Sequence, residues 1–164
     1  MQLHPYLHKV QFYETDGMSI VHHGNHILWM EEARTDFMDQ IGFPYSKAVE
    51  AGIDFAVYSV SCAYRSMTRF GETVAISMSV NRLSPAKMEV AYRMVDAATG
   101  VLRAEGTSGH FFYDRKSNKP VALKRVLPEV YELFGRLLRE QAETCRAAAL
   151  QKEMVKIQTE FTKL

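Results

Sequence analysis

The sequence predicts an α+β fold in which helices cover one antiparallel sheet. Four segments have apolar residues that alternate with period two, and helical patterns lie before and after them. With a shorter alternating segment at the start, the order is strand, helix, four strands, helix, which is typical of an α+β domain. The chain has 164 residues, of which 47% are hydrophobic and 24% charged, so it fits one domain and not a disordered chain.

The N-terminal part predicts one strand and two helices. The expected elements are a strand over 6–14, a loop over 15–24, a helix over 26–41 and a short helix over 44–51. The longer helix follows Asn25, a favoured N-cap residue, and its apolar side chains recur every three or four positions. Gly42 and Gly52 end the two helices, because glycine is favoured just past a helix C-terminus.

The rest of the chain predicts four strands and a final helix. The strands are expected near 58–64, 73–80, 87–94 and 101–113, separated by turn residues that favour antiparallel hairpins. In the last strand, Ala104, Gly106 and Ser108 share one face, and their small size would let a helix approach closely. A long helix is expected from Pro128. Its apolar stripe comprises Val130, Leu133, Phe134, Leu137, Leu138 and Cys145, and continues through Leu150, Met154 and Ile157.

The apolar face of such a sheet must be covered, and the helix over 26–41 is the long helix that precedes the strands. We therefore expect this helix to lie across the sheet. The opposite face carries small and polar residues such as Ser59, Ser77 and Arg93. The sequence leaves open whether that face contacts water or a second copy of the chain.

Composition also excludes several classes of partner. Twenty basic and nineteen acidic residues give a formal charge of +1, which provides no field to attract nucleic acid or an anionic membrane. The sequence has no apolar run long enough to cross a bilayer, and residues 1–12 lack the apolar core of a signal peptide. Cys62 and Cys145 have no CxxC spacing, so we expect free thiols and a cytoplasmic location.

The most specific pattern is VQFYETDGMSIVHHGNHILWMEEAR, over residues 10–34. It resembles the signature of the hotdog-fold thioesterases of the 4-hydroxybenzoyl-CoA thioesterase and YbgC-like acyl-CoA thioesterase group. The matching residues are Tyr13, Glu14, Thr15, Asp16, His23, Glu32, Ala33 and Arg34. The resemblance covers about residues 7–134 and implies a hotdog fold, a five-stranded antiparallel sheet wrapped around a long central helix. On this basis residues 1–134 form the hotdog domain, and 135–164 form a C-terminal helical extension of it.

The resemblance implies hydrolysis of acyl-CoA thioesters to free acid and CoA, with Asp16 and His23 as catalytic residues. A carboxylate can act as a general base toward water or attack the acyl carbon itself, and the sequence does not separate these routes. Backbone NH groups at the start of the helix would polarise the thioester carbonyl. Asp16 stands before Gly17, so an ordinary turn also explains it.

The expected substrate contacts are Gly24, Asn25, His26, Ser61, Arg65 and Arg69. Gly24 would let substrate approach the backbone, and the two arginines would bind CoA phosphates, although solvated turn charges are the commoner explanation for such residues. His22 and His26 stand where many relatives carry aromatic residues. Histidines at 22, 23 and 26 do not have the HExxH spacing, so we expect no metal, and the resemblance implies no cofactor.

The resemblance also implies a homodimer or homotetramer with sites between subunits. Two other interpretations stay open at this point. One is a hotdog protein without catalytic activity, which would bind acyl thioesters or act as a scaffold. The other is a dehydratase of hydroxyacyl thioesters, for which we would expect a histidine with an acidic partner on the helix. The acyl group, and the choice between CoA and a carrier protein as the thiol, are not determined by the sequence.

Overall fold

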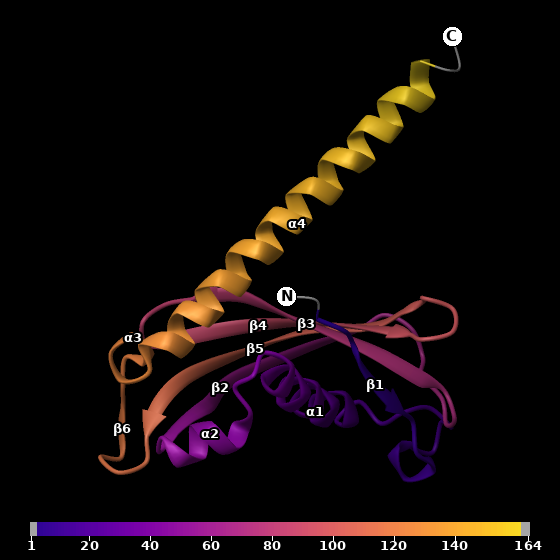
Figure 1. The fold of residues 1–164 in the computed structure, drawn as a ribbon. Helices are drawn as coiled ribbons and strands as arrows, with labels where there is room; N and C mark the ends of the chain where they lie inside the picture. Colours follow the sequence, from indigo (N-terminus) through magenta and orange to yellow (C-terminus); the bar gives the residue numbers. More distant parts are fainter. Residues whose placement is uncertain (1–2, 162–164) are drawn as a thin grey trace.

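A curled antiparallel sheet surrounds one long helix (Figure 1). The structure, a computed structural model, describes residues 3–161, and the side chains in that range apart from 148–150, 152 and 155–161. The strands are β1 Tyr6–Lys9, β2 Ile53–Tyr64, β3 Thr73–Leu83, β4 Lys87–Asp96, β5 Leu102–Asp114 and β6 Lys119–Pro120. The helices are α1 Asn25–Gln40, α2 Tyr45–Glu50, α3 Leu123–Val126 and α4 Pro128–Phe161, and a 3₁₀ turn covers Phe12–Glu14.

The sheet has the order β1-β3-β4-β5-β2, and the short β6 pairs with β5. All of these pairings are antiparallel. The predicted α+β arrangement is therefore confirmed, with β6 and α3 as additions that the sequence did not indicate. β1 and β2 are therefore the two edges of the sheet, although they are consecutive strands along the chain.

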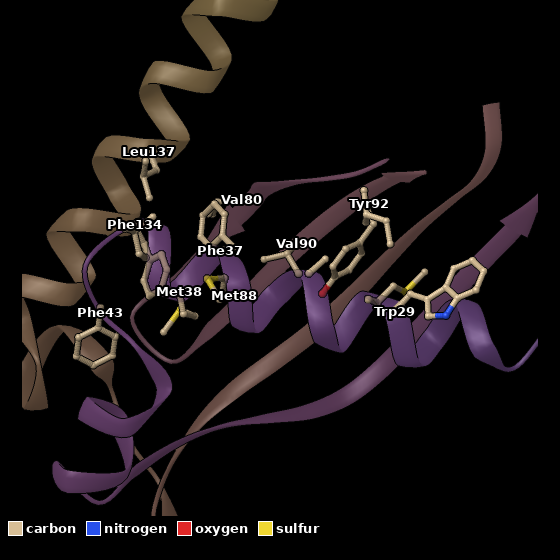
Figure 2. Close-up of a cluster of buried hydrophobic side chains, with 14 of the residues drawn as sticks. Trp29, Phe37, Met38, Phe43, Val80, Met88, Val90, Tyr92, Phe134 and Leu137 are labelled. Atoms are coloured by element: carbon tan, nitrogen blue, oxygen red, sulfur yellow. The ribbon is translucent and has the colours of Figure 1, made fainter. Parts of the chain in front are cut away.

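The core lies between α1 and the concave face of the sheet. From α1, Trp29 and Phe37 are buried, and β4 presents Met88 and Val90 toward them (Figure 2). Burying a side chain of this size contributes roughly 1.5–3 kcal/mol to stability. The predicted placement of the helix across the apolar face is thus confirmed, and the start of the α1 helix is fixed over one end of the sheet.

Small residues on β5 allow α1 to lie close to the sheet, as expected. A Cβ atom added to Gly106 would lie 2.2 Å from Met30 Cε and 2.5 Å from the Ser61 carbonyl oxygen. Both distances are far below van der Waals contact, so this position accepts only glycine without movement of the neighbours. Ala104 and Ser108, which flank it on the same face, are also buried.

A chain of hydrogen bonds crosses the core below α1. Arg34 Nη1 donates to Tyr92 Oη at 3.2 Å, and the Tyr92 hydroxyl pairs with Ser108 Oγ at 2.8 Å. Ser108 Oγ in turn lies 2.7 Å from His110 Nε2. Burial, and then the nearby Arg34 charge, lower the pKa of His110 to about 4, so its imidazole is neutral at physiological pH. These polar groups are paired and hold α1 to β4 and β5.

The C-terminal helix α4 begins at Pro128, as predicted. Figure 2 shows Phe134 and Leu137 directed toward Phe37 and Met38 at the end of α1, and all four side chains are buried. Beyond this contact α4 extends away from the sheet (Figure 1). The expected boundary between residues 134 and 135 falls inside this continuous helix.

The α4 helix also covers the edge of β3. β1 pairs with β3 only from Thr73 to Ile76, and further along that edge Val80 N donates to Gln141 Oε1 at 2.9 Å. The predicted apolar stripe does not continue to Cys145, whose side chain is exposed, or to Met154, which is 68% exposed. Leu150 and Ile157 lie outside the described side chains.

Three local predictions were wrong. The first strand ends at Lys9 instead of residue 14, because Glu14 is buried and closes a 3₁₀ turn. Asn25 does not cap α1, since Gly24 holds the N-cap position and the Asn25 side chain bonds elsewhere. β2 begins at Ile53, ahead of residue 58, because a bulge between Val57 and Ser59 breaks the alternation that the prediction used.

Two general features complete the fold. Among the helices of residues 3–161, none has a stretch long and apolar enough to span a membrane. Cys62 and Cys145 are free thiols, as expected.

The close approach at Gly106 predicts a stability effect. Gly106→Ala should lower the free energy of unfolding by about 1–3 kcal/mol, because Met30 can move aside but the Ser61 carbonyl cannot. Urea denaturation measures the change. Gly135→Ala is the matched control, since its added Cβ would meet no atom closer than 3.5 Å on a helix that alanine favours. An unchanged midpoint for Gly106→Ala would show that the packing is looser than described.

Candidate active site

A buried carboxylate, Glu14, joins the elements that build the site. Its side chain is 5% exposed and accepts hydrogen bonds from three different segments. Trp29 Nε1 of α1 donates at 2.7 Å, and the backbone NH of Gln11 donates at 2.7 Å. The third contact is His8 Nε2 on β1, at 3.0 Å from both carboxylate oxygens. One side chain therefore connects the first strand, the 3₁₀ turn and the central helix.

These contacts also determine the charge of Glu14. Burial by itself raises the pKa of this carboxyl group, but the hydrogen bonds from His8, Gln11 and Trp29 outweigh burial, so the pKa lies below its ordinary value. On the opposite side of the His8 ring, Nδ1 lies 2.8 Å from Glu32 Oε2. The ring also packs on Trp29 with centroids 4.5 Å apart. His8 is thus held between two carboxylates in a largely buried position.

The backbone of Glu14 closes the loop that follows. Its carbonyl oxygen accepts from the NH of His22 at 2.8 Å and from Asn25 Nδ2 at 2.7 Å. Thr15 and Val21 form an isolated antiparallel bridge directly beyond this point. The two ends of the loop are therefore fixed next to each other, at the place where α1 begins.

Asp16 lies at the base of this loop. Its NH donates to the Ile20 carbonyl and its own carbonyl accepts from Ser19, each at 2.9 Å, while Oδ1 accepts from the Met18 NH at 2.8 Å. Ser19 takes a left-handed conformation with φ of 58° to complete the turn. Asp16 is therefore a turn residue, as one interpretation of the sequence expected, and its side chain is also only partly exposed.

A pocket of about 270 Å³ opens beside Asp16 at the N-terminal end of α1. Its lining comes from three parts of the chain: the loop, the first turn of α1, and the end of β2 with the turn after it. The lining residues are Asp16, Met18, Ile20, Val21, His23, His26, Tyr64, Arg65, Ser66, Met67 and Thr68. The structure thus brings together Asp16, His23, His26 and Arg65 from the residues expected at the site.

His23 is exposed at the pocket, and Tyr64 holds its backbone. The Tyr64 hydroxyl donates to the His23 carbonyl at 3.0 Å, and the two rings meet edge to face with centroids 6.4 Å apart. The NH groups of Gly24 and Asn25 are already engaged, with His22 Nδ1 at 3.2 Å and the His22 carbonyl at 3.0 Å. Within residues 3–161, the His23 NH makes no hydrogen bond, and neither do the NH groups of Gly17 and Ile20 in the same loop.

The other expected contacts are spread more widely. Gly24 and Asn25 do not line the pocket, and Asn25 uses its amide to hold Glu14. Ser61 lies on the outer face of the sheet, hydrogen bonded to Thr107 at 2.9 Å, in a shallow depression apart from the pocket. Arg69 Nη1 contacts the Ser19 carbonyl at 3.4 Å without lining the pocket. Arg65, which does line it, also pairs with Glu105 at 3.1 Å.

Sequence reasoning missed Glu14 as an anchor, and it missed His8, Tyr64 and Thr68. Glu14 belongs to the recognised motif, but the alternation of residues 6–14 placed it on a strand and not in a buried turn. Tyr64 and Thr68 come from a distant part of the chain, at the end of β2 and beyond it. No spacing in the sequence indicates that this segment meets the loop around Asp16.

The curled sheet around a central helix is the hotdog fold, the class that the resemblance implied. A hypothetical protein, TT1821 from Thermus thermophilus, is 29% identical, with a TM-score of 0.76 over 82% of this chain and 99% of that one. The DHNA-CoA thioesterase from Staphylococcus aureus has a TM-score of 0.79 over 85% of this chain and 93% of its own. At 24% identity, the second likeness concerns the fold alone.

Sequence comparison gives the family. Residues 10–151 match the thioesterase-like superfamily, and the chain belongs to it. It is also 31% identical, over 126 residues, to YneP of Bacillus subtilis, a protein provisionally named as an acyl-CoA thioesterase. That alignment spans 77% of this chain and 91% of YneP. Membership of this family supports thioester hydrolysis as the general chemistry of the protein.

The Glu14 contacts predict a pH-dependent loss of stability. Glu14→Gln should lower the free energy of unfolding by about 1–3 kcal/mol at neutral pH, because an amide cannot accept from all of the Glu14 donors. The pKa of Glu14 is lowered in the folded protein, so its contribution is present above the ordinary value of 4.5 and is lost as pH falls through the folded value. The gap between wild type and variant should therefore shrink in urea titrations as the pH falls below 4.5 and through the lower folded pKa of Glu14.

Glu132→Gln, an exposed position on α4, serves as the control and should match wild type at every pH. A gap for Glu14→Gln that stays constant from neutral to acidic pH would contradict the assignment of a charged, hydrogen-bonded carboxylate.

Proposed function

We propose that the protein hydrolyses acyl-CoA thioesters, with Asp16 as the catalytic carboxylate. The observation that carries the proposal is the meeting of Asp16 and His23 around one pocket at the N-terminal end of α1. The chain's place in the thioesterase-like superfamily supports this chemistry. The name of YneP as an acyl-CoA thioesterase supports CoA as the thiol.

Asp16 can promote hydrolysis by either of two routes. As a general base it takes a proton from water, whose oxygen attacks the acyl carbon, and the C–S bond then breaks to release the thiolate, which takes up a proton. As a nucleophile its carboxylate oxygen attacks the acyl carbon and displaces the thiolate, and water then hydrolyses the mixed anhydride. Both routes need an ionised carboxylate and consume one water. One carboxylate oxygen of Asp16 is held by the Met18 NH, which fixes its direction in either case.

Negative charge develops on the carbonyl oxygen in both routes. In this proposal the His23 NH and the N-terminal end of α1 stabilise that charge, since the helix dipole is positive at this end. A single donor of this kind is typically worth about 2.7–4 kcal/mol to the transition state. Tyr64 supports the arrangement, because its bond to the His23 carbonyl fixes the peptide next to that NH.

The pocket dimensions limit what it can hold. At about 270 Å³ it lies just below the range of roughly 300–1,000 Å³ that is usual for ligand pockets. We therefore place the acyl group and the thioester in it, with the CoA chain leaving across its rim. Arg65, at that rim, is available to pair with a phosphate in place of Glu105. Arg69, on the adjoining turn, is a second candidate for the same role.

We further propose that the protein is a cytoplasmic homodimer or homotetramer in which β2 meets β2 of a second copy. β2 is an edge strand with exposed apolar residues, including Val57, Tyr58, Val60 and Tyr64 at 46–52%. An uncovered edge of this length favours pairing with another strand. The proposed pairing would bring the second copy next to the pocket, because Tyr64 and Arg65 end this strand. Free thiols favour the cytoplasm.

Replacing Asp16 tests the catalytic proposal. Asp16→Asn keeps the shape and removes the charge, so thiol release from a panel of acyl-CoA esters should fall by roughly 10²- to 10⁴-fold. Asp39→Asn, at an exposed position near the C-terminal end of α1, is the control and should keep full activity. Equal turnover by Asp16→Asn and wild type would exclude Asp16 as the catalytic group. Saturable binding of CoA with no thiol release by wild type would favour a protein that binds thioesters without hydrolysing them.

A charge on the β2 edge tests the proposed assembly. Val60→Lys should shift the protein from an oligomer toward a monomer, because a buried lysine without a partner is unfavourable at an interface. Light scattering coupled to size-exclusion chromatography measures the mass. Val101→Lys is matched in exposure, 48% against 46%, and lies in the turn before β5, so it should leave the oligomer intact. A wild-type monomer, or an unaffected Val60→Lys oligomer, would refute pairing through β2.

A further inference from the structure

The edge of β3 next to β1 is left uncovered along part of its length. β1 pairs with β3 as far as Ile76, which lies opposite Tyr6. By this register His4 would lie opposite Met78. Instead, the NH and the carbonyl of His4 both bond to the side-chain amide of Gln40 on α1, each at 3.0 Å. The N-terminal segment therefore leaves β3 before it reaches Met78.

The backbone of Met78 consequently faces this edge without a partner. Backbone groups of successive residues point to opposite sides of a strand, and the Thr73 carbonyl points toward β4, because it accepts from the Ala97 NH. Met78 is an odd number of residues further on, so its NH and carbonyl point to the other side. The Val80 NH also points there and donates to Gln141 of α4 at 2.9 Å. Within residues 3–161, no hydrogen bond reaches either backbone group of Met78 on that side.

A pocket of about 590 Å³ lies along this uncovered edge, and we call it the β3-edge pocket. β3 contributes residues 76–79 to its lining, α1 contributes the apolar side chain of Phe37, and α4 contributes that of Leu137. The volume lies within the range that is usual for ligand sites. None of its described lining residues belongs to the pocket beside Asp16, so the two pockets are separate.

The acidic side chains around the β3-edge pocket give it one sign of charge. Asp36 of α1 and Glu140 and Glu143 of α4 line it, and its described lining includes no lysine or arginine. Asp36 accepts from Gln40 Nε2 at 2.6 Å, and this uncharged donor leaves the negative charge of Asp36 uncompensated. Complementary charge favours association, so the pocket favours a positively charged ligand.

The unpaired backbone of Met78 distinguishes a peptide from other positively charged ligands. One residue of an extended peptide offers both an NH and a carbonyl, which pair with the two backbone groups of Met78 in the manner of a strand added to a sheet edge. A small organic cation can bind the carboxylates and the Met78 carbonyl, but it offers no acceptor to the Met78 NH. The backbone therefore favours an extended peptide.

The alternation of β3 also sets the direction of the peptide side chains. Residues paired across two strands point to the same face of a sheet. The residue opposite Met78 would share the face of Ile76, which is buried in the core against α1. The residues before and after it would point to the face of Ser77 and Ser79, the side along which α4 extends (Figure 1). An apolar residue between two basic ones fits this arrangement.

We propose that the β3-edge pocket binds an extended peptide segment of a partner protein, in which an apolar residue stands between two lysines or arginines. The segment adds a strand to β3 beside Met78, its apolar side chain packs against Phe37, and its basic side chains pair with carboxylates that include Glu143. Because this pocket is separate from the one beside Asp16, the proposal does not depend on the thioesterase function.

Binding of a short peptide to the full chain tests the proposal. The peptide acetyl-Ser-Lys-Val-Lys-Ser-amide, followed by calorimetry, should bind with saturation at concentrations up to about 1 mM. Glutamates in place of its lysines should raise Kd by roughly tenfold or more. N-methylation of the valine removes the NH that faces Met78 and should also raise Kd roughly tenfold. N-methylation of the lysine after it, whose NH points away from β3, is the matched control and should change Kd by less than about threefold.

Two further measurements place the peptide in the β3-edge pocket. Glu143→Lys reverses a charge on the α4 wall and should raise Kd by roughly 3- to 10-fold. Glu153→Lys, at an exposed position of the same helix outside the pocket, is the control and should bind as wild type does. In amide hydrogen exchange followed by NMR, the Met78 NH should become protected when the peptide binds. The Ser77 NH, which points toward β4, should be protected with and without the peptide.

Four results would overturn the proposal. The first is no saturable binding of the lysine peptide. The second is equal Kd values for the parent and the N-methylvaline peptides, which would mean attraction of charge without strand pairing. The third is binding of lysinamide as tight as that of the peptide, which would make the ligand a small cation. The fourth is a Met78 NH that is already protected without peptide, which would mean that another segment of this chain or a second copy covers the edge.

Discussion

The buried carboxylate of Glu14 is the constraint on which the candidate site depends. An ionised group so far from water is stable only when its oxygens are paired, and here β1, the 3₁₀ turn and α1 each supply a donor. Its carbonyl oxygen fixes His22 and Asn25 as well. Both ends of the loop that carries Asp16 are thus held by a single residue, Glu14. The position of Asp16 depends on this anchor, together with the hydrogen bonds that Asp16 makes inside its own turn.

The second constraint is the close contact between α1 and the sheet. Gly106 leaves room for Met30, and the paired groups from Arg34 to His110 hold the helix in register with β4 and β5. With the helix axis fixed in this way, the positive end of α1 is directed toward the Asp16 loop. In the proposed mechanism, packing in the core therefore affects catalysis, because it sets where the helix dipole and the His23 NH lie relative to the Asp16 carboxylate.

The opposite wall of the pocket is held by a separate network. Arg103 donates to the Met67 carbonyl at 2.6 Å and also pairs with Asp96 and Glu72. The Arg103 guanidinium, followed by the hydrogen bonds from Thr99, lowers the pKa of Asp96 to about 2, so this ion pair persists over the physiological range. The turn that carries Met67 and Thr68 is therefore fixed by this network.

The sequence by itself determined the α+β class, three of the four α-helices of the described residues, most strand positions and the motif that contains Asp16 and His23. The class and the elements depend on local period and local turn chemistry, which a linear sequence displays directly, whereas the motif was identified by its resemblance to a family. Only the tertiary structure decided that Glu14 is buried, that Asn25 binds Glu14 and does not cap the helix, and that Ser61 lies apart from Asp16. It also decided that Thr68 reaches the pocket. The pairing of a polar group depends on which distant segment approaches it, and that approach is set by the packing of α1 on the sheet.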